Sequence, residues 1–103
     1  MKLPVVHGDE LYCDLQDIAR FLRRQHEAQA ERFLRSVYRS FDQLSLHPHL
    51  GRLRPEYQQP NLRSWGVRGF EQYLIFYSVR QNDLLVYRII HGSRDLDAEL
   101  SAD

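Results

Sequence analysis

The residues best suited to chemistry stand together in the run His91-Gly92-Ser93-Arg94, at the end of the last strand-like segment. Histidine changes its charge near neutral pH, so His91 could act as a general acid or base. The planar guanidinium of Arg94 could hold a phosphate or a carboxylate. Each has a structural alternative, since His91 can end a strand with an ordinary hydrogen bond and Arg94 can pair with a nearby acid.

Arginine also dominates the middle of the chain. Residues 32–94 contain ten arginines against four acids, whereas residues 1–31 have four basic against six acidic residues and residues 95–103 have four acids and no base. The formal net charge of zero therefore hides a basic middle between acidic ends. Arginine favours planar contacts with oxyanions, although many surface arginines only form salt bridges. The candidates for binding a target are Arg52, Arg54, Arg63, Arg68, Arg88 and Arg94.

No pattern indicates a metal or cofactor. His47 and His49, even combined with His91, fit no common zinc spacing. Cys13 is the only cysteine, which excludes an intrachain disulfide and is typical of a reducing compartment. The sequence has no apolar run of about 18 residues and no signal-peptide pattern at its start. We therefore expect a cytoplasmic protein without a membrane partner.

Strand-like segments must position the chemical residues. The runs 73–79 and 84–90 are rich in Val, Ile, Tyr and Phe, and Gln81-Asn82-Asp83 joins them as a loop of hairpin length. An earlier run at residues 63–68 turns at Arg68-Gly69-Phe70. These segments predict a three-stranded antiparallel meander.

Two amphipathic helices are predicted before the meander. One apolar stripe runs from Leu11 to Leu22, with a stop and a cap at Gly8-Asp9 and an end near residue 25. A second stripe runs from Ala30 to Leu44 and ends at Pro48. The break near residues 26–28 contains neither Gly nor Pro, so a helical hairpin and a single bent helix both remain open.

The remaining segments complete one domain, residues 1–103. Residues 2–7 read as a short strand, which Pro4 places at a sheet edge or a strand start. Residues 47–60 contain three prolines and a glycine and predict a long basic loop. The predicted fold is α+β: an N-terminal strand, a two-helix hairpin on one sheet face, and the antiparallel meander.

Several short motifs follow one another in a definite order. They are Ala30-Glu31-Arg32-Phe33, Pro48-x-x-Gly51, Arg54-Pro55-Glu56, Trp65-x-Val67-x-Gly69-Phe70 and the run from Arg88 to Leu96. In this order the chain resembles the ParE/RelE superfamily of bacterial type II toxins, from Val5 to about Leu96. The resemblance implies a β-α-α-β-β-β fold, a role in plasmid stabilisation, and a cognate antitoxin that lies along the helix pair and sheet in a hetero-oligomer.

The superfamily has two activities, and the RelE-like one is cleavage of mRNA in the ribosome. That reaction needs a base for the 2′-hydroxyl, cations for the charged intermediate and a proton donor. In RelE-like chains, lysines, arginines and a C-terminal tyrosine supply these groups. Here Arg94, Arg63 and His91 are the candidates, but no lysine follows Lys2 and Leu100 stands near the tyrosine's place.

The chain is therefore more similar to ParE, whose members inhibit DNA gyrase by binding it. A net charge of zero also disfavours a ribosome-binding protein, because binding to rRNA depends on neutralising phosphates. We expect a gyrase inhibitor, with ribosome-dependent mRNA cleavage as the alternative. A second alternative is a non-toxic binding module with a decayed target surface, in which the acidic tail Asp95 to Asp103 repels phosphate from Arg94.

The apolar stripes belong to the core first, but so small a domain could leave part of their surface for an antitoxin helix. The candidates for binding the antitoxin are Leu11, Leu15, Phe33, Val37, Phe41 and Trp65.

Overall fold

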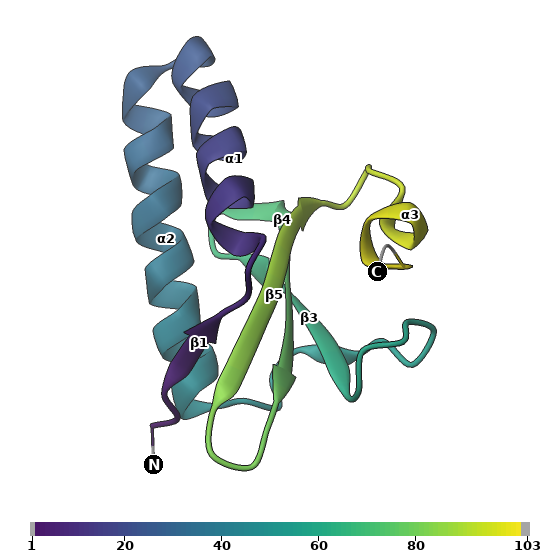
Figure 1. The fold of residues 1–103 in the computed structure, drawn as a ribbon. Helices are drawn as coiled ribbons and strands as arrows, with labels where there is room; N and C mark the ends of the chain where they lie inside the picture. The colour runs from purple at the N-terminus through teal and green to yellow at the C-terminus, as the bar shows by residue number, and fades with distance from the viewer. Residues whose placement is uncertain (1, 102–103) are drawn as a thin grey trace.

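The computed structural model describes residues 2–101 and confirms the predicted α+β order (Figure 1). Asp103, the last acid of the predicted tail, lies outside the described residues. Five strands form one sheet in the order β1-β5-β4-β3-β2, in which β1 runs parallel to β5 and the other neighbours are antiparallel. The elements are β1 (Val5–His7), α1 (Leu11–Gln25), α2 (Glu27–Leu46), β2 (Arg52–Leu53), β3 (Leu62–Val67), β4 (Phe70–Val79), β5 (Leu84–His91) and α3 (Leu96–Ser101).

Helices α1 and α2 form a hairpin on one face of the sheet. His26 between them has an extended backbone, with φ −164° and ψ 123°, which excludes a single bent helix. The cap predicted at Asp9 is wrong, because Glu10 is the N-cap residue and the carbonyl of Gly8 accepts the Leu11 N–H at 3.2 Å. The start of α1 is therefore fixed by a backbone hydrogen bond and not by a side-chain cap.

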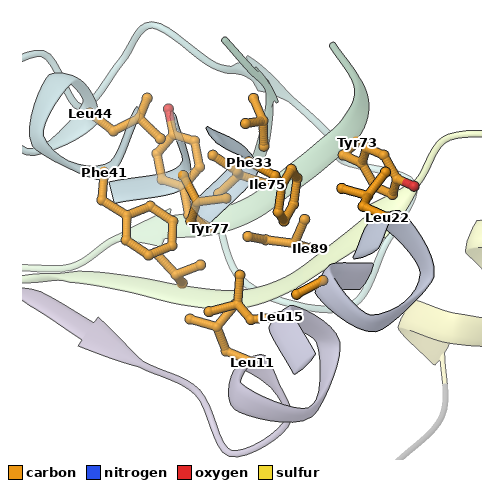
Figure 2. Packing of buried hydrophobic residues seen from close by; sticks show 14 of the residues in the cluster. Leu11, Leu15, Leu22, Phe33, Phe41, Leu44, Tyr73, Ile75, Tyr77 and Ile89 are labelled. Atoms are coloured by element: carbon orange, nitrogen blue, oxygen red, sulfur yellow. The ribbon is translucent and has the colours of Figure 1, made fainter. Parts of the chain in front are cut away.

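The main core lies between this hairpin and the sheet (Figure 2). Leu11 of α1 and Phe33 and Val37 of α2 are fully buried against Ile75 and Tyr77 of β4. Each buried side chain of this size contributes about 1.5–3 kcal/mol through removal of apolar surface from water. The core therefore holds the hairpin firmly on the sheet.

A smaller core covers the opposite face of the sheet, where the predicted fold had no helix. Helix α3 lies on the side of the sheet away from α1 and α2 (Figure 1). Its Leu100 is buried with Leu62, Phe76 and Ile90. Helix α3 begins at a cap, because Asp95 Oδ1 accepts a backbone N–H of its first turn at 3.2 Å. The segment expected to be an acidic tail is thus folded onto the sheet as far as it is described.

The predicted long loop contains the two-residue strand β2 and is fixed by a buried tyrosine. The hydroxyl of Tyr77 donates to the carbonyl of Pro48 at 2.8 Å and accepts the Gly51 N–H at 2.9 Å. Burial raises the pKa of Tyr77. A Cβ atom on Gly51 would lie only 2.6 Å from the tyrosine hydroxyl, so the loop requires glycine there.

Candidate functional site

The residues singled out at the end of β5 line a groove of about 550 Å³ between α1 and β5, which we call the β5 groove. Strand β1 pairs only with residues 84–86, so the rest of β5 is an edge that faces α1. The register shifts between Phe76, opposite Arg88, and Tyr77, opposite Val86. This bulge re-aims the side chains beyond it. The groove brings together the predicted residues Arg88, His91 and Arg94.

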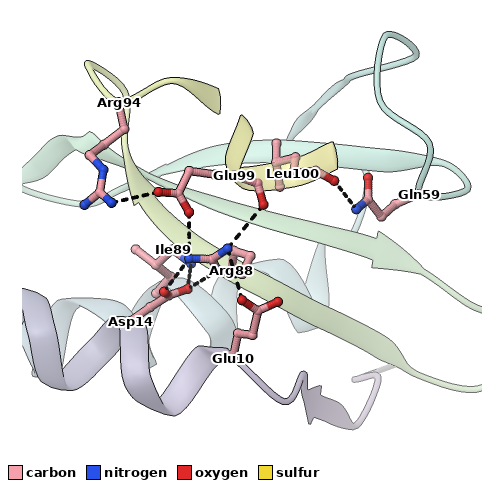
Figure 3. Close-up of polar contacts among 8 residues, drawn as sticks. All are labelled: Glu10, Asp14, Gln59, Arg88, Ile89, Arg94, Glu99 and Leu100. Atoms are coloured by element: carbon pink, nitrogen blue, oxygen red, sulfur yellow. Dashed lines mark hydrogen bonds and ion pairs between the residues drawn. The ribbon is translucent and has the colours of Figure 1, made fainter. Parts of the chain in front are cut away.

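Arg88 is the centre of an ion-pair network that joins three elements (Figure 3). Its Nε and Nη2 donate to the two carboxylate oxygens of Asp14 at 2.7 and 2.8 Å. Glu99 of α3 lies 3.2 Å away and Glu10 lies 3.4 Å away. Asp14 also accepts the Ile89 N–H of the open edge at 3.1 Å. Hydrogen bonding to Asp14 raises the pKa of Arg88, so this guanidinium is held as a structural cation.

Arg94 and His91 lie at the mouth of the groove. Arg94 is exposed, and its Nη2 lies 2.7 Å from Glu99 Oε1. Glu99 is therefore shared between Arg88 and Arg94. The Nδ1 of His91 accepts the Ser93 N–H at 3.1 Å and lies 2.7 Å from Ser93 Oγ. His91 thus ends β5 and bonds locally to the following turn.

Two other candidate arginines are engaged within the fold. Arg54 is only 9% exposed, donates to Ser64 Oγ at 2.8 Å, and stacks 5.6 Å above the ring of Phe76. Arg63 donates to the carbonyl of Gly51 at 2.7 Å. Both guanidinium groups therefore hold the loop before β3 against the sheet.

Arg52 and Arg68, the last two candidates, are exposed. Arg52 lies on the short outer strand β2, and Arg68 lies in the turn between β3 and β4. Neither lines the β5 groove within residues 2–101. The six predicted arginines therefore do not line one groove, and among them only Arg88 and Arg94 line the β5 groove.

The predicted antitoxin-binding residues are mostly core residues. Among them Trp65 is half-buried and packs at the edge of the main core, and the others are buried. The reason is geometric, because the stripes from which they were chosen face the sheet. The buried five are Leu11, Leu15, Phe33, Val37 and Phe41.

Accessible apolar surface on the helices comes from their outer side. A groove of about 350 Å³ lies between α1 and α2 and is lined by Tyr12, Leu34 and Tyr38, with Arg20 and Arg23 at its side. Tyr12 is 68% exposed and Tyr38 is 50% exposed. We call this the hairpin groove. The sequence reasoning missed Tyr12 and Tyr38 because it followed only the buried stripes, although the predicted residue Leu15 also lines this groove.

The sequence reasoning also missed Asp14 and Glu99, the partners of Arg88. Asp14 stands three residues after Leu11 and four before Ile18, so it falls inside the apolar stripe of α1. An acid at such a position is a signal for a buried ion pair, because charged groups are rarely buried without a partner. Glu99 gave no comparable signal.

Neither a metal-binding cluster nor a membrane-spanning helix is found in the described part of the chain. No three His, Cys, Asp or Glu side chains among residues 2–101 are grouped so that they could hold a metal ion. Cys13 is exposed and unpaired there. No helix within the same residues has both the length and the apolar character needed to span a membrane.

Comparison with known proteins gives one family. The family described as "ParE toxin of type II toxin-antitoxin system, parDE" matches residues 13–96. No curated protein matches the chain. The matched range contains Asp14, Arg88, His91 and Arg94 of the β5 groove, whereas Glu99 lies beyond its end.

Proposed function

The chain belongs to the ParE toxin family of type II toxin-antitoxin systems, and we propose that it inhibits DNA gyrase by binding it and is neutralised by a cognate antitoxin. The observation that carries the proposal is how the charged residues and the histidine of the β5 groove are paired. Its cations and its histidine are engaged in contacts within the chain, which favours a role in binding over a role in acid–base chemistry. Arg94 is the exposed cation of this groove and the residue we assign to the target contact.

The composition of the groove argues against RNA cleavage. Leu100, near the place of the tyrosine in RelE-like chains, is buried in the smaller core. Tyr73, the tyrosine that lines the groove, is also buried, and burial raises its pKa. Its burial shields it from a phosphodiester. No lysine follows Lys2 to supply the missing cation.

An assay of gyrase supercoiling with detection of cleavage complexes tests the proposal, run beside mRNA cleavage on programmed ribosomes. The parent should inhibit gyrase, and Arg94→Ala should weaken inhibition roughly tenfold, as expected for the loss of one charge-assisted contact. Arg80→Ala is the matched control, because Arg80 is also exposed and paired with a neighbouring acid, Asp83, but lies outside the β5 groove. Cleavage of mRNA in the ribosomal A site, without gyrase inhibition, would replace the proposal with the ribonuclease alternative.

We place the antitoxin on the hairpin groove. Exposed tyrosines beside a small apolar cleft are suited to the apolar face of an amphipathic helix. Tyrosine is also among the residues that contribute most to protein interfaces. A toxin bound in this way forms a hetero-oligomer through the outer side of its helices.

A specific observation also supports an attenuated toxin. Glu99 contacts both Arg88 and Arg94, at 3.2 and 2.7 Å. The acid therefore neutralises charge at the groove and would compete with a phosphate or carboxylate of the target. On this second proposal the fold is intact and its target surface is partly masked by α3.

A further inference from the structure

The unpaired positive charge of the chain lies mainly outside the β5 groove. Of the ten arginines in residues 32–94, half are engaged in hydrogen bonds or ion pairs within the chain, namely Arg54, Arg63, Arg80, Arg88 and Arg94. Within residues 2–101 the other five form no ion pair, and all are exposed; they are Arg32, Arg35, Arg39, Arg52 and Arg68.

Three of these line a single groove, which we call the basic groove. It has a volume of about 740 Å³ and lies between α2 and the first residues of β4. Arg32, Arg35 and Arg39 form one wall, since spacings of three and four residues share a helix face. They span about 10 Å along α2, at 1.5 Å per residue. The lining residues between and opposite them include Gln25, Gln29, Ser36, Gly69, Phe70 and Gln72.

The basic groove has no acidic lining residue in the part of the chain that is described. The acid nearest to its turn, Glu71, directs a carboxylate oxygen to the Gly69 N–H at 2.8 Å. The turn itself is held beside α2, because the Arg68 N–H donates to Ser40 Oγ at 3.4 Å. The arginine row therefore faces a fixed, uncharged wall and forms no ion pair within residues 2–101.

We propose that the basic groove binds the phosphodiester backbone of duplex DNA. Arginine matches phosphate oxygens bidentately, and glutamine and serine side chains also bond to phosphates. Phosphates follow one another every 3.4 Å of axis on one strand of B-form DNA. Neighbouring phosphates are further apart than this rise because the strand winds around the axis, so a row of three arginines about 10 Å long can contact at most about three phosphates of one strand.

The apolar residues of the basic groove argue against a peptide or a single strand as its occupant. Leu22 is buried in the main core, and the half-buried ring of Phe70 packs edge-on against Phe33 at 5.3 Å. Leu22 therefore offers no accessible side chain for a peptide anchor, and part of the Phe70 ring that a base could stack on is covered by Phe33. The inference is independent of which enzyme the toxin inhibits, because its three arginines lie outside the β5 groove, although the two grooves adjoin and share the lining residues Leu22, Gln25 and Gln72.

Fluorescence anisotropy with a labelled 20-base-pair duplex tests this, using the full chain and its variants at 50–200 mM salt. Three phosphate contacts predict that binding by the parent weakens about 40-fold across this range. Arg35→Gln/Arg39→Gln should bind more weakly at 50 mM salt and lose only about fourfold across the range. Arg24→Gln/Arg52→Gln removes the same charge from two exposed positions outside the three grooves and should behave like the parent. Circular dichroism verifies that each variant is folded. The single variant Arg35→Gln should lower the slope of the logarithm of the binding constant against the logarithm of the salt concentration by about 0.9 in magnitude.

Several outcomes would overturn the proposal. They include no binding of the duplex by the parent at 50 mM salt, and equal losses in the two double variants, which would indicate a diffuse charge effect. Tighter binding of poly-aspartate or of single-stranded DNA than of the duplex would assign the groove to another ligand. A shift to dimers on gel filtration that Arg35→Gln/Arg39→Gln abolishes would assign it to the acidic end of a second copy.

Discussion

At the scale of single residues, the contact between Arg88 and Asp14 is the one on which most others depend. The side chains are only 15% and 10% exposed, and their hydrogen bonds join α1 to the open edge of β5. Arg88→Met leaves the Asp14 carboxylate without its closest cation. We expect a loss of about 3 kcal/mol in the free energy of unfolding, as is typical when one partner of a buried pair is removed. Urea denaturation of the purified chain measures it.

Two further variants distinguish the destabilisation caused by the unpaired Asp14 carboxylate from the destabilisation caused by lost packing. Asp14→Asn/Arg88→Met removes the charge and keeps an oxygen for the Ile89 N–H, so it should be more stable than Arg88→Met alone. Arg20→Met breaks an exposed pair with Asp17 and should change stability by less than about 1 kcal/mol. If Arg88→Met were no more destabilising than Arg20→Met, the ion pair between Arg88 and Asp14 would not stabilise the packing of α1 on β5.

Gly51 is the second residue that the fold requires. A Cβ atom there would lie 2.6 Å from the Tyr77 hydroxyl and 2.8 Å from the Ser64 carbonyl oxygen, and Tyr77 is fully buried. Gly51→Ala should therefore destabilise the chain by about 1–3 kcal/mol, the usual cost of overpacking, measured by thermal unfolding. In the control Gly92→Ala, the nearest atom lies 3.5 Å from the added carbon, so little change is expected. Equal melting temperatures of the two variants would contradict this reading of the Pro48-x-x-Gly51 motif.

At the scale of elements, α3 decides how much of the β5 groove is available. Glu99→Gln removes the carboxylate that pairs with Arg94 and should strengthen gyrase inhibition about two- to fivefold, the equivalent of one exposed ion pair. The supercoiling assay measures this, and a growth assay follows its effect in cells. Asp97→Asn, a neutralisation on the same helix, is the matched control because Asp97 does not line the groove within residues 2–101. The same inhibition by both variants and the parent would rule out masking by Glu99.

The elements that local patterns define were predictable from the sequence. The stripe from Leu11 to Leu22 predicted a helix ending near residue 25, where α1 ends. Strand β2 was not predictable, because its two residues are a strand only through pairing with Ser64 and Arg63 of β3. Helix α3 is too short for a periodic pattern, and the cap at Asp95 was its only local signal.

The candidate site was predictable only in part, for a physical reason. The run from His91 to Arg94 carries recognisable residue types, but Arg88 and Asp14 are separated by 74 positions. Their contact depends on the bulge in β5, and a shift of one residue in register would turn Arg88 to the opposite face. Local patterns do not determine such a register.

At the scale of the whole molecule, α2 contributes to two surfaces of different chemistry. Tyr38 belongs to the apolar hairpin groove, whereas Arg35 and Arg39 belong to the basic groove. The β5 groove is a third surface, formed by α1, β5 and α3. We infer that antitoxin, DNA and target contacts are divided among these surfaces. Variants of residues that line only one of these surfaces should therefore leave the binding properties of the others unchanged, whereas Leu22, Gln25 and Gln72 line both the β5 groove and the basic groove.

The antitoxin contact tests this division most directly. Tyr12→Ser/Tyr38→Ser removes both exposed tyrosines of the hairpin groove and should weaken antitoxin binding at least about 100-fold, as expected for two interface hot spots. Co-expression followed by gel filtration and calorimetry measures the complex. The variant should still inhibit gyrase, because both tyrosines lie outside the β5 groove.

Leu46→Ser is the control, since Leu46 is 52% exposed on the same helix as Tyr38 but does not line the hairpin groove. The parent should be more soluble and melt at a higher temperature with its antitoxin, because a ligand that binds only the folded state stabilises it. Equal solubility with and without the antitoxin, and no complex on gel filtration, would contradict antitoxin binding itself. A complex that survives in Tyr12→Ser/Tyr38→Ser would instead place the antitoxin on another surface and leave the hairpin groove without its proposed partner.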